Sequence, residues 1–177
     1  MLENIHGIIF DLDGTLIDSM GVWTQIDKEY LAAKGFQVPD NLVDEISHLG
    51  FDAVALYFKN TFGLSDSTDL IKATWHQMAI YHYSNDIPMK SGASEFLRYL
   101  KRLGLKIGLA TSNSRELLEA ALRKHDIYDY FDTISITSEV ARGKNFPDVY
   151  LLSAERLGVA PEQCLVFEDL YAAVMGA

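Results

Sequence analysis

Two aspartates separated by one residue, Asp11 and Asp13, follow directly on the apolar residues 8–10 of the chain. A short run of β-branched and aromatic residues is typical of a strand that is buried on both faces of a parallel sheet. A carboxylate at the end of such a strand is costly unless a metal ion or a bound ligand compensates its charge. An aspartate in that place can also attack phosphorus as a nucleophile, with Mg²⁺ bridging carboxylate and phosphate oxygens.

Two other segments, residues 105–113 and 163–169, show the same change from an apolar strand to polar residues. Since the carboxyl ends of neighbouring parallel strands form the ligand crevice of an open sheet, we expect these polar residues to converge. A fourth candidate strand, residues 133–137, leads into the loop that carries Lys144. The converging set is Asp11, Asp13, Thr111, Ser112, Asn113, Glu168 and Asp169.

The acidic members of this set suit metal binding and proton transfer. Asp11 and Asp169, with Glu168 as a third candidate, supply the oxygen ligands that Mg²⁺ prefers. Asp13 would point to the same side as Asp11 if the strand continued, and could then protonate a leaving oxygen and later activate water.

The neutral and basic members suit phosphate. Thr111, Ser112 and Asn113 precede an expected helix, so their hydroxyl, amide and backbone N–H groups are suitable donors to phosphate oxygens. Lys144 adds the positive charge that a transferring phosphoryl group needs in the transition state. Asp18 and Ser19 either line the same pocket or belong to an ordinary turn.

The elements between these strands carry helical periodicity, as βαβ units require. Helices are predicted within residues 91–104, 113–126 and 148–158, the second behind an Asn113 or Ser114 cap. The expected fold is therefore α/β, a doubly wound parallel sheet.

The interval from residue 20 to residue 87 shows only helical periods, so it reads as an inserted helical bundle. We expect an α/β core domain of residues 1–15 and 88–177 and an α-helical cap domain of residues 16–87. Trp23, Trp75 and Tyr81 lie on helical stripes of this insertion and are predicted to be core residues.

Composition narrows the possible partners. The chain has 177 residues, 49% of them hydrophobic, and a net charge of −10. This charge argues against nucleic acid and membrane surfaces as partners. Cys164 is the single cysteine, there is no signal peptide and there is no apolar stretch of membrane-spanning length, so a cytoplasmic location is expected.

Four motifs in order carry a family resemblance: "DLDGT" at 11–15, "TSN" at 111–113, Lys144 before "PD", and "ED" at 168–169. Together they resemble the haloacid dehalogenase superfamily, in its branch of β-phosphoglucomutase-like phosphatases with a helical cap. The resemblance implies Asp11 as nucleophile and Asp13 as acid and base. It also implies Mg²⁺ held by Asp11, the Asp13 carbonyl and Asp169, and phosphate held by Thr111 and Lys144.

The function expected first is a Mg²⁺-dependent phosphatase that hydrolyses a small phosphorylated metabolite, such as a sugar phosphate, through an aspartyl-phosphate. A phosphosugar mutase is the alternative, but the resembled mutases carry a cap-loop Arg and a cap-helix His where this chain has "HLGFDA" and "SMGVWTQ". A non-catalytic member of the fold is the third reading, because Leu170 and Ala173 replace the Ser and Gly usual after "ED". In the resembled fold, the loop carrying His48 faces the active site.

The resembled family continues beyond the helix that follows Asp169 into at least one more parallel strand, which this sequence lacks. We therefore expect the outer edge of the 163–169 strand to be open, and self-association through that edge is a further expectation.

Overall fold

The computed structural model describes residues 4–47 and 49–177, so His48 lies outside the described residues. The chain divides into two compact units: Met1–Met20 with Tyr83–Ala177, and Gly21–His82. We call the first the α/β unit and the second the helical unit.

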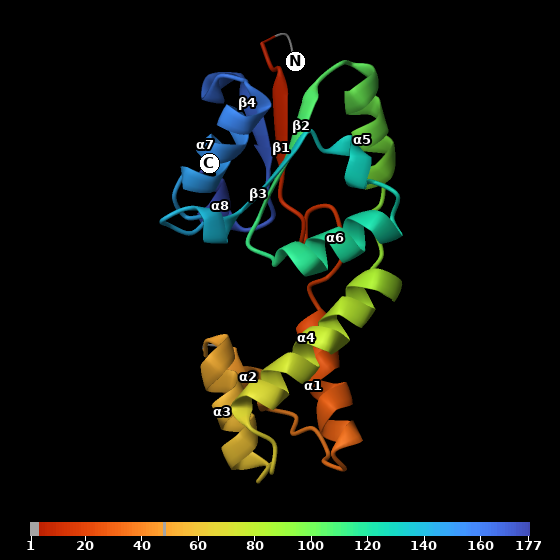
Figure 1. The fold of residues 1–177 in the computed structure, drawn as a ribbon, viewed down its shortest axis with the longest axis vertical. Coiled ribbons are helices and arrows are strands. Elements are labelled where there is room, and N and C mark those ends of the chain that lie inside the picture. The colour runs from red at the N-terminus through yellow and green to blue at the C-terminus, as the bar shows by residue number, and fades with distance from the viewer. Residues whose placement is uncertain (1–3, 48) are drawn as a thin grey trace. The chain divides into compact units, whose positions relative to one another are not determined.

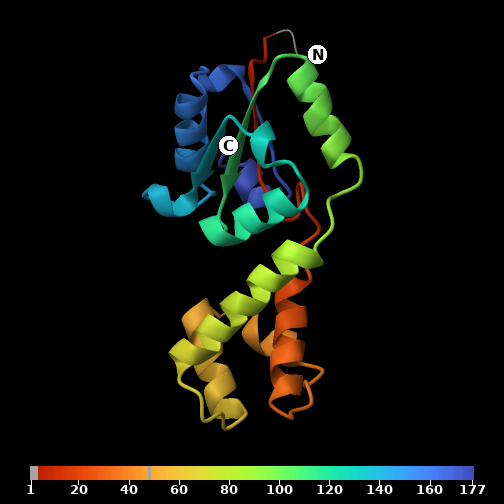
Figure 2. The same ribbon diagram turned by 45° about the vertical axis from the view of Figure 1, so that its right-hand side comes forward.

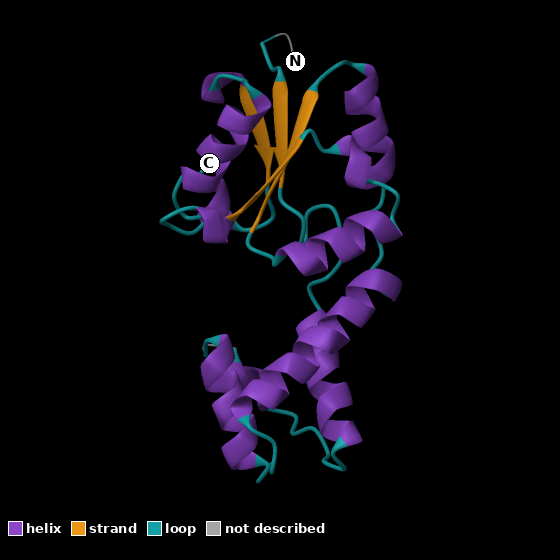
Figure 3. Cartoon of the chain, in the orientation of Figure 1, coloured by secondary structure: helices purple, strands orange, loops and turns teal. Residues whose placement is uncertain are grey.

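The α/β unit contains one parallel sheet of four strands in the order β3-β2-β1-β4 (Figure 3). The strands are β1 (Gly7–Phe10), β2 (Lys106–Thr111), β3 (Thr133–Ile136) and β4 (Cys164–Phe167). β1 pairs in parallel with both β2 and β4, so the strand that precedes Asp11 lies inside the sheet. Among the described residues β4 pairs with β1 alone and forms one edge.

Helices pack against both faces of this sheet (Figure 1). On one face Ile9 of β1 lies in a core cluster with Val149 and Ala154 of α7 (Asp148–Leu157). The opposite face carries Phe10, which meets Phe96 of α5 (Ala93–Arg102) edge to face at a centroid distance of 6.0 Å. Side chains alternate along β1 and are buried on both sides, as the continuous apolar run predicts.

The remaining elements of the α/β unit are short or lie between strands. They are α6 (Arg115–Lys124), α8 (Tyr171–Val174) and the 3₁₀ turns η1 (Tyr128–Tyr130), η2 (Thr137–Glu139) and η3 (Pro161–Gln163). The predicted doubly wound parallel sheet is confirmed, with each strand beginning or ending within a few residues of its predicted bounds.

The two stretches of the α/β unit that lead to and from the helical unit run side by side. The Asp18 amide donates to the Pro88 carbonyl at 2.9 Å, and the Lys90 amide donates to the Leu16 carbonyl at 2.8 Å. The Lys90 ammonium also pairs with the Asp18 carboxylate at 2.8 Å. These bonds hold the segment just before Ser19 against residues 88–90 of the same α/β unit.

The helical unit is formed by α1 (Val22–Ala33), α2 (Leu42–Ile46), α3 (Phe51–Thr61) and most of α4 (Thr68–Asn85). In Figure 2, α1 in orange and α4 in yellow-green lie side by side. Trp75 of α4 is the centre of the core, with ring-centroid distances of 5.7 Å to Tyr30 and 4.9 Å to Phe58. The periodic apolar residues thus form a bundle with an aromatic core.

Trp75 is 1% exposed, which confirms its predicted core position. The same prediction is wrong for Trp23, which is 41% exposed, and for Tyr81, which is 60% exposed. Both lie on helix faces that the rest of this unit does not cover.

Among the described residues, none of the helices combines the length and the apolar composition that a membrane-spanning helix needs.

Candidate active site

Lys144 joins two carboxylates at the carboxyl end of the sheet. Its ammonium donates to Asp11 Oδ1 and to Glu168 Oε1, and its side chain is 10% exposed. Asp11 follows β1 and Glu168 follows β4, which are paired neighbours. The parallel pairing therefore brings Asp11 and Glu168 together, and Lys144 reaches both from the loop before α7 (Asp148–Leu157).

The Asp11 carboxyl group is buried, with 5% of the residue exposed. Burial raises the pKa of Asp11 to about 6, while the charge and hydrogen bond of Lys144 act in the opposite direction. The Glu168 charge raises it further. A buried carboxylate beside a second one needs more positive charge than one lysine supplies, which is what a divalent cation would add.

Oxygen atoms of Asp11, Glu168 and Asp169 lie within 4.8 Å of one another. Carboxylate oxygens are the ligands that Mg²⁺ prefers, so the donor set fits this ion. Glu168 is already engaged, since it accepts hydrogen bonds from the Tyr150 hydroxyl at 3.0 Å and from the Asp169 amide at 3.1 Å. Asp11 and Asp169 are therefore the members with the most freedom to bind a cation.

Gly14 allows Asp169 to approach the first motif. Its φ of +88° lies in the left-handed region, which glycine adopts without strain. A Cβ atom at this position would stand 2.1 Å from Asp169 Oδ2. A side chain here would thus displace the carboxylate that belongs to the candidate metal site.

Asp13 is held separately from Asp11 by three donors. Tyr83 donates to its Oδ1 at 2.5 Å and Ser19 to the same oxygen at 2.7 Å, while the Asn113 amide donates to Oδ2 at 2.8 Å. β1 ends at Phe10, so the condition under which strand alternation would place Asp13 on the same side as Asp11 is not fulfilled. Its position comes from these hydrogen bonds instead.

Tyr83 is the residue of this site that the sequence did not reveal. It is 2% exposed, and burial together with the Asp13 charge raises the pKa of its phenol well above the usual range. The phenol therefore keeps its proton and remains a donor. Nothing in the sequence near Tyr83, inside a helical stretch 70 residues from Asp13, marks it as part of the site.

The segment after β2 carries the candidate phosphate donors. Thr111 is 1% exposed, and its hydroxyl accepts a hydrogen bond from the Asn113 amide at 3.1 Å. Ser112 is exposed. Of the two predicted caps, Ser114 is the one observed, because its hydroxyl accepts from the Leu117 amide at the start of α6. Asn113 is thereby left to contact Asp13.

A family model for haloacid dehalogenase-like hydrolases matches residues 5–177. The chain belongs to this family. The "Phosphorylated carbohydrates phosphatase" of Thermotoga maritima is 30% identical over 174 residues, covering 98% of this chain and 80% of that protein. "Hexitol phosphatase B" of Escherichia coli K12 is 30% identical over 169 residues, covering 94% of this chain and 76% of that protein.

Among solved structures, a "putative beta-phosphoglucomutase" from Thermotoga maritima superposes with a TM-score of 0.89 at 28% identity. It covers 97% of this chain, which spans 80% of that one. The predicted family and branch are confirmed. The phosphatase names of the relatives also confirm the predicted enzyme class, a phosphoric monoester hydrolase.

Proposed function

We propose that the chain is a Mg²⁺-dependent phosphatase that hydrolyses a small sugar phosphate through an aspartyl-phosphate on Asp11. The observation that carries this proposal is the set of contacts around Asp11. Lys144 lies on one of its oxygens, and two further acidic residues supply oxygens within 4.8 Å. A nucleophilic carboxylate between a cation and a metal-ligand set is suited to attack a dianionic phosphate.

The chain's own residues account for each bond and proton. A carboxylate oxygen of Asp11 attacks phosphorus, the bond from phosphorus to the ester oxygen breaks, and Asp13 gives its proton to the departing alcohol. Asp13 then takes a proton from water as that water attacks the aspartyl-phosphate. The bond between Asp11 and phosphorus breaks, inorganic phosphate leaves and Asp11 is free again.

Lys144 and Thr111 serve the phosphoryl group in this scheme. The Lys144 ammonium already touches the Asp11 oxygen, so it lies where charge develops on a phosphoryl group in transfer. Mg²⁺, held by Asp11, Asp169 and the Asp13 carbonyl, would neutralise the negative charge that otherwise keeps phosphate from the carboxylate. Glu168 holds Lys144 in place.

The substrate class rests on the relatives. Two of them are named as phosphatases of phosphorylated carbohydrates and of hexitol phosphates. We assign a sugar phosphate or sugar-alcohol phosphate to this chain by analogy with them. The helical unit, inserted after the first motif, is proposed as the cap that selects the organic part of the substrate.

The test is phosphate release from a panel of sugar and polyol phosphates at millimolar Mg²⁺. Release should stop with EDTA and in Asp11→Asn, and should persist in Asp129→Asn, which removes an exposed carboxylate elsewhere in the α/β unit. Full activity of Asp11→Asn would overturn the proposal. Phosphate that reappears on sugar instead of in solution would favour the mutase alternative.

A further inference from the structure

Both oxygens of the Glu168 carboxylate accept hydrogen bonds inside the α/β unit. Oε1 accepts from the Lys144 ammonium and from the Tyr150 hydroxyl, the latter at 3.0 Å. Oε2 accepts from the backbone amides of Asp169 and Leu170 at 3.1 Å and 3.4 Å. The Glu168 side chain is 1% exposed, so water is a poor substitute for a missing donor there. The position of this carboxylate is therefore set by these donors.

Tyr150 is a rigid member of this group. It lies in α7, is 4% exposed, and belongs to the core cluster that contains Ile9 and Ala154. A phenol keeps its proton at neutral pH, so the hydroxyl group acts as a donor. The ring centroid also lies 5.9 Å from the Lys144 nitrogen, within the range of a cation–π contact. Tyr150 thus approaches both members of the Lys144–Glu168 pair.

The backbone of Lys144 has little room to move. Gly176, after α8, is buried, and a Cβ atom there would stand 2.2 Å from the Lys144 carbonyl oxygen and 2.7 Å from the Asn145 carbonyl carbon. The two backbone segments therefore approach each other closely. Because its backbone is confined on this side, the direction of the Lys144 ammonium depends on the groups around the end of its side chain.

Those groups include two carboxylates that share the one ammonium. Lys144 donates to Asp11 and to Glu168 at once. Because Tyr150 also donates to the same Glu168 oxygen, that carboxylate is partly satisfied without Lys144. Without the phenol, the ammonium would be the one described donor left to this buried oxygen, and it would be drawn from Asp11 toward Glu168.

Packing alone does not require the Tyr150 hydroxyl group. A phenylalanine ring would fill the same core position beside Ile9 and Ala154 without burying a polar atom. The acceptor of the hydroxyl group is the carboxylate that binds Lys144. The ring therefore serves the apolar core, while the hydroxyl group belongs to the charged site.

We infer that Tyr150 is a positioning residue of the active site, whose hydroxyl group holds Glu168 so that the Lys144 ammonium remains on Asp11. Lys144 is then in place to stabilise the phosphoryl group during its transfer. The effect on phosphoryl transfer rests on the proposed function, whereas the coupling of Tyr150 to Lys144 rests on the hydrogen bonds to Glu168 alone.

Tyr150→Phe removes the hydroxyl group and keeps the ring. With Mg²⁺ and p-nitrophenyl phosphate as the probe, kcat/KM should fall on the order of tenfold, as expected for the loss of a hydrogen bond to a charged group. The loss should be equally large with an alkyl phosphate, because Lys144 serves the phosphoryl group that both esters share. A clearly larger loss with the alkyl ester would assign Tyr150 to the leaving group and overturn the inference.

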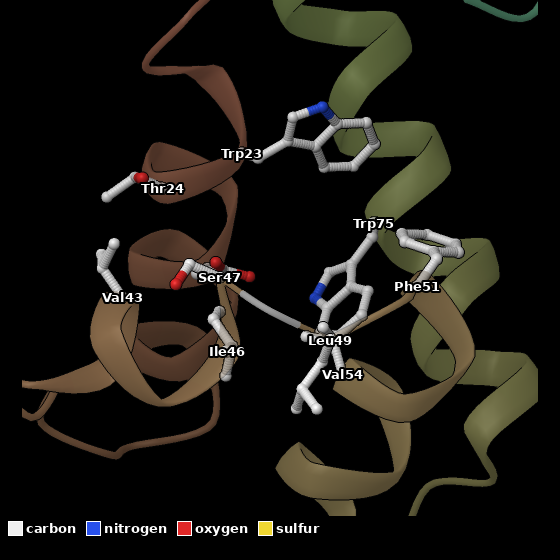
Figure 4. A pocket seen from close by; sticks show the side chains of 10 residues that line it. Trp23, Thr24, Val43, Ile46, Ser47, Leu49, Phe51, Val54 and Trp75 are labelled. Carbon is white, nitrogen blue, oxygen red and sulfur yellow. The ribbon is translucent and has the colours of Figure 1, made fainter. Parts of the chain in front are cut away.

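Tyr30→Phe is the matched control. Tyr30 is 2% exposed and its hydroxyl donates to the Asp66 carboxylate at 3.1 Å, so this variant also loses a bond from a buried tyrosine to a carboxylate. Tyr30 lies in the helical unit and is not among the described residues that line the pocket of that unit, which Figure 4 shows. Tyr30→Phe should lose stability as Tyr150→Phe does, but should keep the kcat/KM of the wild type.

Urea unfolding of Tyr150→Phe, Lys144→Met and the double variant measures the coupling of the two residues without any activity. Since both side chains donate to one oxygen, the unfolding equilibrium constant of the double variant should differ on the order of tenfold from the product of the two single effects. Tyr30→Phe and Lys144→Met should combine additively, because their described contacts have no partner in common.

Circular dichroism establishes that each variant is folded. Additive effects of Tyr150→Phe and Lys144→Met, or equal kcat/KM in Tyr150→Phe and Tyr30→Phe, would overturn the inference and leave the proposed function standing if the wild type is active. A wild type that releases no phosphate from any ester would refute the proposed function instead. The unfolding measurements would then still decide whether Tyr150 acts on Lys144.

Discussion

Tyr83 donates a 2.5 Å hydrogen bond to the Asp13 carboxylate across 70 residues of sequence. The same oxygen accepts from Ser19, and both donors lie next to the points where the chain enters and leaves the helical unit. Two of the three donors that position the carboxylate proposed as acid and base thus lie outside the four motifs, and the third, Asn113, lies within one. Tyr83 is buried and keeps its proton, so it acts as a fixed donor.

Tyr83→Phe should lower kcat/KM for an alkyl phosphate on the order of tenfold, because Asp13 loses one of the three bonds that orient it. The effect on p-nitrophenyl phosphate should be clearly smaller, since its leaving group needs little protonation. Steady-state kinetics with both esters distinguish these cases. Tyr99→Phe, an exposed tyrosine of α5, is the control, and equal losses with the two esters would mean that Tyr83 acts only through stability.

Asp169→Asn should raise the Mg²⁺ concentration for half-maximal activity on the order of tenfold or more, because one of the proposed metal ligands loses its charge. Saturating Mg²⁺ should restore part of the activity. Metal titrations of the wild type, Asp169→Asn and Asp129→Asn measure this. An unchanged Mg²⁺ requirement in Asp169→Asn would show that Asp169 is not a principal ligand.

Gly14→Ala tests the close approach of Asp169. Gly104 is the matched control position, since it also has a positive φ. A Cβ atom at Gly104 would have no heavy atom within 4 Å, whereas at Gly14 the nearest atom would be 2.1 Å away. Both alanine variants should lose about 1 kcal/mol of stability from backbone strain. Only Gly14→Ala should also need more Mg²⁺, and a normal requirement in that variant would contradict the geometry.

Much of the fold follows from residues near one another in the sequence. Residues 7–10 form a continuous apolar strand, so a buried parallel strand was predictable, and the ends of such strands meet. That is why Asp11 and Glu168 could be expected together. Lys144, which its charge and the family resemblance assign to the site, is found in contact with both. The helical periods of residues 20–87 likewise predicted a helical bundle, and α1 to α4 form one.

The rest depends on packing that periodicity does not encode. Trp23 lies on an apolar stripe as Trp75 does, yet only Trp75 is covered by neighbouring helices. Tyr83 reaches Asp13 because of where α4 ends, and no local pattern fixes that. β1 ends at Phe10, so Asp13 lies beyond the strand. The alternation of side chains along a strand therefore does not decide where Asp13 points.

Asp27 provides a test based on pH. Its pKa is raised from 3.8 to about 6 by burial, so the folded chain holds a proton that the unfolded chain releases between these values. Raising the pH from about 4 to about 6 therefore lowers the free energy of unfolding. Above about pH 6 the folded state bears the full cost of a charged, partly buried Asp27 carboxylate. Asp27→Asn removes this cost.

Urea unfolding should show Asp27→Asn more stable than the wild type at pH 8, on the order of 1 kcal/mol after allowance for partial solvent exposure. The difference should disappear near pH 4. Asp44→Asn, an exposed aspartate, should follow the wild type at both values. A stability difference for Asp27→Asn that is the same at pH 4 and pH 8 would exclude the titration of Asp27 as its cause.

The central claim is that Asp11 carries the phosphoryl group. The most direct measurement is rapid acid quenching of the enzyme during turnover of a sugar phosphate with Mg²⁺, followed by mass spectrometry of its peptides. We predict a phosphoryl adduct on the peptide that contains Asp11, absent in Asp11→Asn and absent when EDTA is added before the substrate. Steady phosphate release with no adduct on this peptide at any quench time, or an adduct on another residue, would contradict the account.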